Sequence, residues 1–181
     1  HLPIEKFKEM DYKAIESYNI SIELMMENAG YQLARLIASE IPEKGKVFFG
    51  IGTGNNGGGG LVAARRLLAW GYQVFLDLPA KKLNELADLQ LKRALAFGAK
   101  ISELEAPDIF VDAWLGFSQR LPLSKPYQNS VERANKLKCK KISLDLPTGF
   151  NKQNGESIFK PDVIMTLAAM KSELLDMEDK V

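Results

Sequence analysis

Hydrophobic residues recur along this chain in two alternating patterns. Segments 4–18 and 21–38 place apolar residues at helical spacing. From residue 46 onward, short and almost continuously apolar runs alternate with segments of helical period. The apolar runs predict strands at 46–52, 72–78, 107–116, 141–149 and 161–169, and the helical period predicts helices at 61–70, 84–98 and 126–137.

Strands that are apolar on both faces are typical of parallel sheets covered by helices on two sides. Since strands and helices alternate, we expect one doubly wound α/β domain that covers the whole chain. In such sheets, ligands bind beyond the carboxyl ends of the strands, near the point where the strand order reverses. Chemistry should therefore be sought where the predicted strands end.

Composition narrows the kinds of chemistry that remain. The formal net charge is +1, which gives no overall attraction to nucleic acid or to an anionic membrane. No apolar run approaches the length of about 18 residues that spans a membrane. Cys139 is the only cysteine, so an internal disulfide and a thiolate zinc site are excluded, and a reducing cytoplasm is the expected compartment. The only histidine is His1, so catalysis must rely on carboxylates, lysines, hydroxyls or the backbone.

Residues 50–60 read G-I-G-T-G-N-N-G-G-G-G, between a predicted strand and a predicted helix. They contain the G-x-G-x-x-G of dinucleotide-binding turns, and Asp77 ends the next strand, where a ribose-binding acid would stand. A tight turn without a ligand is the alternative. The two asparagines add donors and acceptors that a pyrophosphate turn does not need, while the helix N-terminus would still attract an anion. No Lys-Ser/Thr pair follows the glycines, which excludes a P-loop.

Two further strand ends carry polar residues. Asp112 lies near the end of the strand V-D-A-W-L-G, and Asp145 and Thr148 end the strand S-L-D-L-P-T-G. Because the carboxyl ends of parallel strands meet at one edge of the sheet, these residues should converge with the glycine segment on one crevice. A carboxyl group desolvated there can have a raised pKa, so Asp145 is a candidate acid and base.

Five motifs resemble, in order, those of the YjeF N-terminal domain family, the NAD(P)H-hydrate epimerases. They are L-M-M-E-N-A-G, G-T-G-N-N-G-G-G-G, V-D-A-W-L-G, S-L-D-L-P-T-G and K-P-D-V-I-M-T. The resemblance implies a Rossmann-like three-layer α/β/α fold with a mostly parallel sheet. It implies a single domain over residues 1–181, with N-terminal helices at about 3–40 and a Rossmann-like core at about 46–171. The implied activity interconverts the R and S epimers of NAD(P)HX, the hydrated form of reduced nicotinamide cofactors.

The resemblance also implies site residues, a potassium ion, a homodimer and an NAD(P)HX dehydratase as functional partner. It places catalysis on Asp145 and on Lys171 of L-A-A-M-K. It implies oxygen ligands to potassium from Asn56, Asp112 and Thr148. The implied substrate-binding residues are Asn55, Asn56, Gly57, Gly58, Gly59, Gly116, Phe117, Ser118, Gln119, Arg120, Leu121, Pro122 and Asp145.

The chain departs from the family pattern at two places. Gly59 stands where the family loop has an aspartate, and Phe117-Ser118 stand where the family has Thr-Gly. The loss of a carboxylate leaves a second hypothesis open, a nucleotide-binding or protein-interaction module that kept the fold without turnover. An ordinary NAD-dependent dehydrogenase is a third hypothesis, and it lacks an evident general acid in a chain without an internal histidine.

Overall fold

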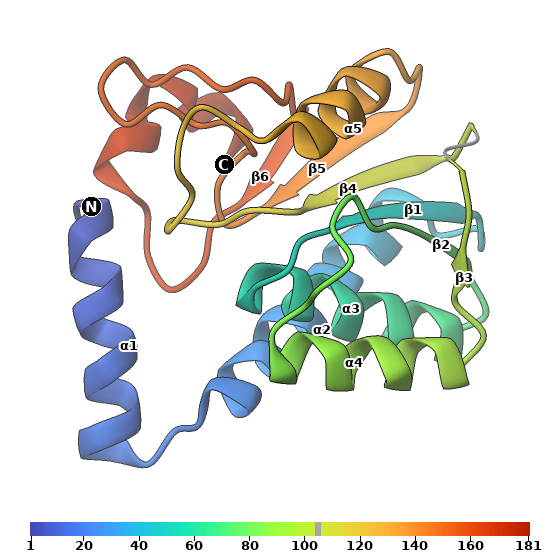
Figure 1. Ribbon diagram of the computed structural model, residues 1–181, viewed down its shortest axis with the longest axis horizontal. Helices are drawn as coiled ribbons and strands as arrows, with labels where there is room; N and C mark the ends of the chain where they lie inside the picture. Colours follow the sequence, from blue (N-terminus) through green and yellow to red (C-terminus); the bar gives the residue numbers. More distant parts are fainter. Residues whose placement is uncertain (104–105) are drawn as a thin grey trace.

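The computed structural model describes residues 1–103 and 106–181. Two helices come first, strands and helices then alternate as far as β3, and β4, α5, β5, β6 and the C-terminal segment follow (Figure 1). The elements are α1 (Ile4–Tyr18), α2 (Ile22–Glu40), β1 (Lys46–Ile51), α3 (Asn55–Ala69), β2 (Gln73–Asp77), α4 (Glu85–Ala96), β3 (Lys100–Ile101), β4 (Ile109–Ala113), α5 (Lys125–Asn135), β5 (Lys140–Leu144), β6 (Val163–Met165) and the 3-10 segment η1 (Ser172–Lys180). Within the described residues, no helix has the length and apolar character needed to cross a membrane.

The strands form one six-stranded sheet in the order β3-β2-β1-β4-β5-β6. Every pairing between neighbouring strands is parallel, which confirms the predicted α/β class. The chain runs outward from β1 in one direction and then, from β4, in the other. The strand order therefore reverses between β1 and β4, and a ligand is expected above the carboxyl ends of these two strands.

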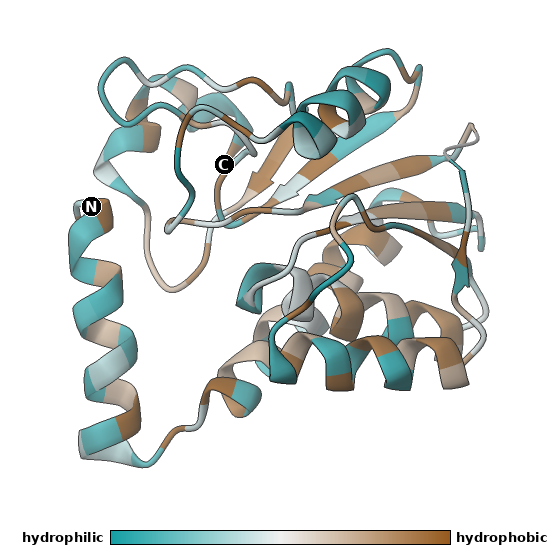
Figure 2. Cartoon of the chain, in the orientation of Figure 1, coloured by the Kyte–Doolittle hydropathy of each residue, from teal (hydrophilic) through white to brown (hydrophobic). Residues whose placement is uncertain are grey.

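The sheet is buried on both faces because alternate strand residues point to opposite sides. On β1, Val47, Phe49 and Ile51 pack with helices α2 and α3, whereas Phe48 packs with the α5 residues on the other face. The layers are thus helix, sheet and helix. Figure 2 shows β1 and β4 coloured largely hydrophobic and the helices alternating between hydrophobic and hydrophilic positions.

The glycine run is helical, whereas the sequence predicted a loop here and a helix only from residue 61. Helix α3 begins at Asn55 and includes all four glycines that follow the asparagines. Glycine is a poor helix former, so tertiary packing must compensate. A Cβ atom on Gly60 would stand 2.5 Å from Cβ of Ala113, and one on Gly57 would stand 2.1 Å from the carbonyl oxygen of Gly52. These glycines let α3 lie directly against β1 and β4.

The N-terminal residues lie beside the segment that follows β6 (Figure 1). The Leu2 N–H donates to the Met170 carbonyl at 3.0 Å, and the Ser172 N–H donates back to the Leu2 carbonyl at 2.9 Å. Ile4 of α1 packs with Leu174 in a third hydrophobic cluster. The strand β3 and the segment η1 were not predicted from the sequence. Both are too short or too irregular to show a period.

Candidate functional site

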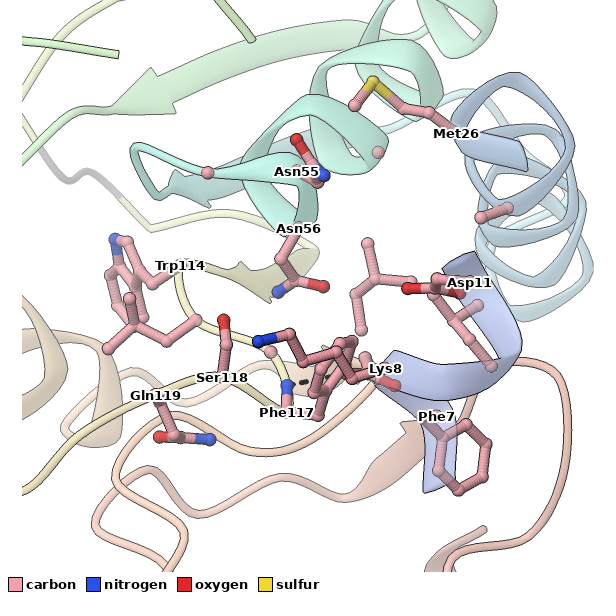
Figure 3. A pocket seen from close by; sticks show the side chains of 18 of the residues that line it. Phe7, Lys8, Asp11, Met26, Asn55, Asn56, Trp114, Phe117, Ser118 and Gln119 are labelled. Atoms are coloured by element: carbon pink, nitrogen blue, oxygen red, sulfur yellow. Dashed lines mark hydrogen bonds between the residues drawn. The ribbon is translucent and has the colours of Figure 1, made fainter. Parts of the chain in front are cut away.

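A cavity of about 720 Å³ opens above the carboxyl ends of the central strands. Its walls come from the start of α3, from the loop after β4, from the turn after β5 and from one side of α1. The sheet therefore supplies three strand ends to one cavity, at the place where the strand order reverses. Figure 3 shows this cavity from close by.

Most of the predicted substrate-binding residues line this cavity. The lining includes Asn55, Asn56, Gly59, Gly116, Phe117, Ser118, Gln119, Arg120 and Asp145. Gly57, Gly58, Leu121 and Pro122 are outside the lining. The first two are buried within α3, and Leu121 is 44% exposed on the outer surface. The close packing of α3 on the sheet explains why only Asn55, Asn56 and Gly59 of residues 55–60 face the cavity.

Asp145 is held rigidly at the cavity floor, directly after β5. Its φ angle is +72°, in the left-handed region that residues other than glycine rarely adopt. Its N–H donates to the Met165 carbonyl at 2.8 Å, and its Oδ2 accepts from the Phe117 N–H at 2.9 Å. The side chain is buried, and Oδ1 lies 2.7 Å from Lys171 Nζ. Strained backbone and a buried ion pair are both typical of functional positions.

Lys171 lies behind Asp145 and is completely buried. Its ammonium also donates to Thr166 Oγ1 at 2.9 Å and to the Leu167 carbonyl at 3.2 Å. The Phe7 ring of α1 covers it, with the ring centroid 4.2 Å from Nζ. All three ammonium protons thus have acceptors, and Lys171 is outside the cavity lining. In this arrangement the lysine orients Asp145, and Asp145 faces the cavity.

Asp112 lies beneath the cavity and is completely buried. Its carboxylate accepts from the Ser143 hydroxyl at 2.9 Å, from the Thr148 N–H at 2.7 Å and hydroxyl at 2.6 Å, and from the Trp114 N–H at 3.2 Å. Burial raises the pKa of Asp112 to about 6, although these hydrogen bonds act in the opposite direction. Asp112 ties the turn after β5 to the end of β4.

The three predicted potassium ligands offer the hard oxygens that suit an alkali cation. However, the four hydrogen bonds to Asp112 occupy both lone pairs of each carboxylate oxygen. The Thr148 hydroxyl is itself turned toward Asp112. As these residues lie, they do not fit a cation, and one could enter only if hydroxyl groups turned away from Asp112. No chemical step below depends on the ion.

Asn56 stands at the beginning of α3 with an amide that has an unused donor. Its Nδ2 is buried and lacks a hydrogen-bond partner within residues 1–103 and 106–181. Figure 3 shows the Asn56 amide pointing into the cavity. The N–H groups of the first helical turn face the same space, and a helix N-terminus attracts anions. Buried polar groups are normally paired, so this end of the cavity is suited to a polar, anionic ligand.

A family model described as YjeF-related protein N-terminus matches residues 22–173. The chain belongs to this family. It is 38% identical to the NAD(P)H-hydrate epimerase of Rhodopirellula baltica, over 92% of this chain and 74% of that protein. It is 35% identical to the bifunctional NAD(P)H-hydrate repair enzyme Nnr of Archaeoglobus fulgidus, over 88% of this chain and 35% of that protein. Among solved structures, yeast ynu0 (YNL200c) superposes with a TM-score of 0.83 at 27% identity, over 94% of this chain and 81% of that one.

Helix α1 lies before the segment that the YjeF family model matches, and its part in the site was not predicted. Lys8 and Asp11 line the cavity together with Phe7 (Figure 3). The pKa of Asp11 is raised, first by burial and then by the negative charge of Asp145, while Lys171 acts against both. The apolar spacing predicted the helix α1 but no role for it in the site. Charged residues next to that apolar stripe were the available signal.

Proposed function

We propose that this protein is an NAD(P)H-hydrate epimerase that interconverts the R and S forms of NAD(P)HX and so repairs damaged nicotinamide cofactors. One structural observation carries the proposal: a buried Asp145–Lys171 ion pair borders a cavity that also contains a helix N-terminus. Membership of the YjeF family and its curated relatives named as epimerases support it. Epimerisation of NAD(P)HX needs an acid that transfers a proton to the ring hydroxyl. Binding of NAD(P)HX needs a site for its anionic diphosphate.

The chemistry requires little beyond a proton and an ordered site. The ring nitrogen of NAD(P)HX can expel the neighbouring hydroxyl once that hydroxyl is protonated, which leaves an iminium cation that water can attack again. Asp145 would move the proton, and Lys171 would hold Asp145 in position. The N–H groups at the start of α3 and the Asn56 amide would hold the diphosphate. A carboxylate beside the ring would also stabilise the cation.

A coupled assay tests the proposal. A dehydratase specific for the S form consumes that epimer from an equilibrium mixture, and the residual R form then disappears at the rate of epimerisation. We expect this protein to accelerate the loss of the R form, and Asp145→Asn to lower kcat by about 100-fold or more. Loss of the R form at the rate of a protein-free control would contradict the proposal.

A binding module without turnover is the second candidate, and one observation favours it. Gly59 lines the cavity without a side chain. A Cβ atom there would contact only Leu144 Cδ2, at 3.3 Å, so an aspartate has room to enter the cavity. If the unmodified chain is inactive and Gly59→Asp is active in the coupled assay, the second candidate is correct.

We also propose potassium as the bound ion, a homodimer, and an NAD(P)HX dehydratase as the functional partner. The name of the Archaeoglobus relative, a bifunctional repair enzyme, supports a coupled second activity.

For potassium to bind, the Thr148 hydroxyl would turn from Asp112 to the ion. We therefore expect KCl to raise the thermal unfolding midpoint more than equal NaCl. In Thr148→Val, KCl and NaCl should raise the midpoint equally. If KCl still raises it more than NaCl, Thr148 is not a potassium ligand.

A further inference from the structure

Inversion of a ring carbon by loss and return of its hydroxyl requires proton transfer on both faces of the ring. The hydroxyl leaves one face as water, so an acid must supply a proton there. Water returns on the other face, so a base must remove a proton there. Under the proposed function, on which this inference rests, Asp145 serves one face. A second proton-transfer group is needed on another wall of the cavity.

Helix α1 supplies a wall that does not belong to the sheet. Its lining residues all lie on one side of the helix: Phe7, Lys8, Asp11, Tyr12 and Ile15. Figure 3 shows Lys8 and Asp11 on the α1 side of the cavity, apart from Asn56 and Trp114 on the sheet side. Asp11 is the only carboxylate among these α1 residues.

Phe7 determines where Asp11 lies. The Phe7 ring covers the Lys171 ammonium at 4.2 Å, and the same ammonium is paired with Asp145 at 2.7 Å. Asp11 follows Phe7 by one helical turn and therefore stands on the same side of α1. The two carboxylates consequently border one cavity from two different walls, Asp11 from α1 and Asp145 from the sheet edge.

The beginning of α1 is fixed to the C-terminal segment. The Ile4 N–H donates to both carboxylate oxygens of Glu173, at 3.0 and 3.2 Å. Ile4 itself is 1% exposed and Phe7 is 4% exposed. Anchoring of this kind holds a helix in one orientation, as a proton-transfer group requires.

Asp11 is suited to carrying a proton. The groups that face it are Asp145 and Lys171 from the C-terminal half and Lys8 from its own helix. Burial and the charge of Asp145 raise its pKa, against the opposing effect of Lys171. The Asp11 carboxylate makes no hydrogen bond and no ion pair with residues 1–103 and 106–181. Asp11 is also exposed to solvent, so it can exchange its proton with water.

We propose that Asp11 is the second proton-transfer residue of this site and acts on the ring face opposite to Asp145. When the hydroxyl faces Asp11, the protonated acid donates to it. The carbon–oxygen bond breaks with its electron pair on the departing water, and the nitrogen lone pair forms a C=N bond. Water on the other face then adds to the carbon, the C=N pair returns to nitrogen, and the Asp145 carboxylate accepts the released proton. One water leaves and one enters, and no oxidation state changes.

Oxygen-18 water separates the two faces experimentally. Each purified epimer is incubated separately with protein in labelled water, and inversion and label uptake are followed by chromatography and mass spectrometry. The variants are Asp11→Asn, Asp11→Glu and Glu16→Gln. Glu16 lies on α1 outside the cavity lining, so its variant removes a charge from the same helix without touching the site. Thermal unfolding midpoints check that each variant is folded.

We expect Asp11→Asn to lower kcat for inversion by about 100-fold or more, and Asp11→Glu to restore part of the rate. The epimer whose hydroxyl faces Asp145 should still take up oxygen-18 without inverting, while the other epimer should neither take up label nor invert. A residue that only supports the fold would reduce both processes together. Glu16→Gln should behave as the unmodified protein does.

Two outcomes would overturn different claims. If the unmodified protein inverts neither epimer faster than a protein-free control, the proposed function fails, and the assignment of Asp11 fails with it. If the unmodified protein is active and Asp11→Asn inverts at the same rate, only the assignment fails. Equal loss of label uptake from both epimers in Asp11→Asn would also overturn it.

Discussion

Replacing Lys171 by methionine removes a buried charge while keeping the length of the side chain. The substitution leaves the Asp145 carboxylate buried without its ion-pair partner at 2.7 Å. It also removes the hydrogen bonds to Thr166 Oγ1 and the Leu167 carbonyl and the contact with the Phe7 ring. Removing one partner of a buried ion pair typically costs about 3–5 kcal/mol. We expect the free energy of unfolding of Lys171→Met to fall by about that amount.

A double-mutant cycle, measured by urea unfolding at pH 7, separates the ion pair from the other contacts of the lysine. The cycle compares Asp145→Asn, Lys171→Met and the double variant with the unmodified protein. Each single variant leaves one buried charge without a partner, whereas the double variant leaves no unpaired charge at this site. We expect the double variant to lose about as much as one single variant, which corresponds to a coupling energy of about 3–5 kcal/mol in magnitude. Additive losses, within about 0.5 kcal/mol, would refute the claim that these residues form one buried unit.

Two further predictions concern the packing of α3. Glu27 of α2 accepts from Arg65 Nη2 at 2.5 Å and from Arg66 Nη2 at 2.8 Å. Burial alone would raise the pKa of Glu27, but the hydrogen bonds and positive charges of the two arginines outweigh burial. The pKa of Glu27 is therefore below its ordinary value. A lowered pKa stabilises the fold above the unfolded-state value of 4.5, and this contribution disappears as the pH falls through the folded-state pKa. Glu27→Gln should therefore lower the free energy of unfolding by about 1–2 kcal/mol at pH 7, less in acid, and an equal loss at both pH values would contradict this. Gly60→Ala should lower the free energy of unfolding by about 1–3 kcal/mol, because its Cβ would lie 2.5 Å from Ala113 Cβ. Gly59→Ala, whose Cβ would have one contact at 3.3 Å, should be neutral or stabilising by up to about 1 kcal/mol. Both values are measured by urea unfolding.

The sequence predicted the sheet well because its strands depend on local patterns. A short apolar run next to a glycine-rich segment, such as that of β1, is typical of a buried strand between two helical layers. The beginning of α3 could not be predicted in the same way. Gly57 and Gly60 have low helix propensity, and only their close approach to Gly52 and Ala113 makes the helix favourable. Gly60 and Ala113 are far apart in the chain, so no local pattern contains their approach.

From the sequence, a site residue could be proposed where the end of one strand was sufficient evidence. Asp145 was a candidate because a polar residue at the end of a buried strand is unusual. For Lys171, resemblance indicated the position, but the reason for it lies in an ion pair with Asp145 and a ring contact with Phe7. The bonds between Asp112 and Thr148 likewise require that β4 and β5 be neighbours. The sequence contains these residues but does not show that they hydrogen-bond to one another.

Helix α1 shows what amphipathic spacing alone conceals. The helix was predicted correctly, but Met10 and Tyr18, which fit the apolar period, are 38% and 66% exposed. Only its first turn is buried, and from there the same side of the helix continues along the cavity as Lys8 and Asp11. A helix that merely covered a core would keep charged residues off that side. In α1, charged residues interrupt the apolar side one turn after the last buried residue. This pattern indicates that the helix leaves the core there and lines a site, as inferred for Asp11.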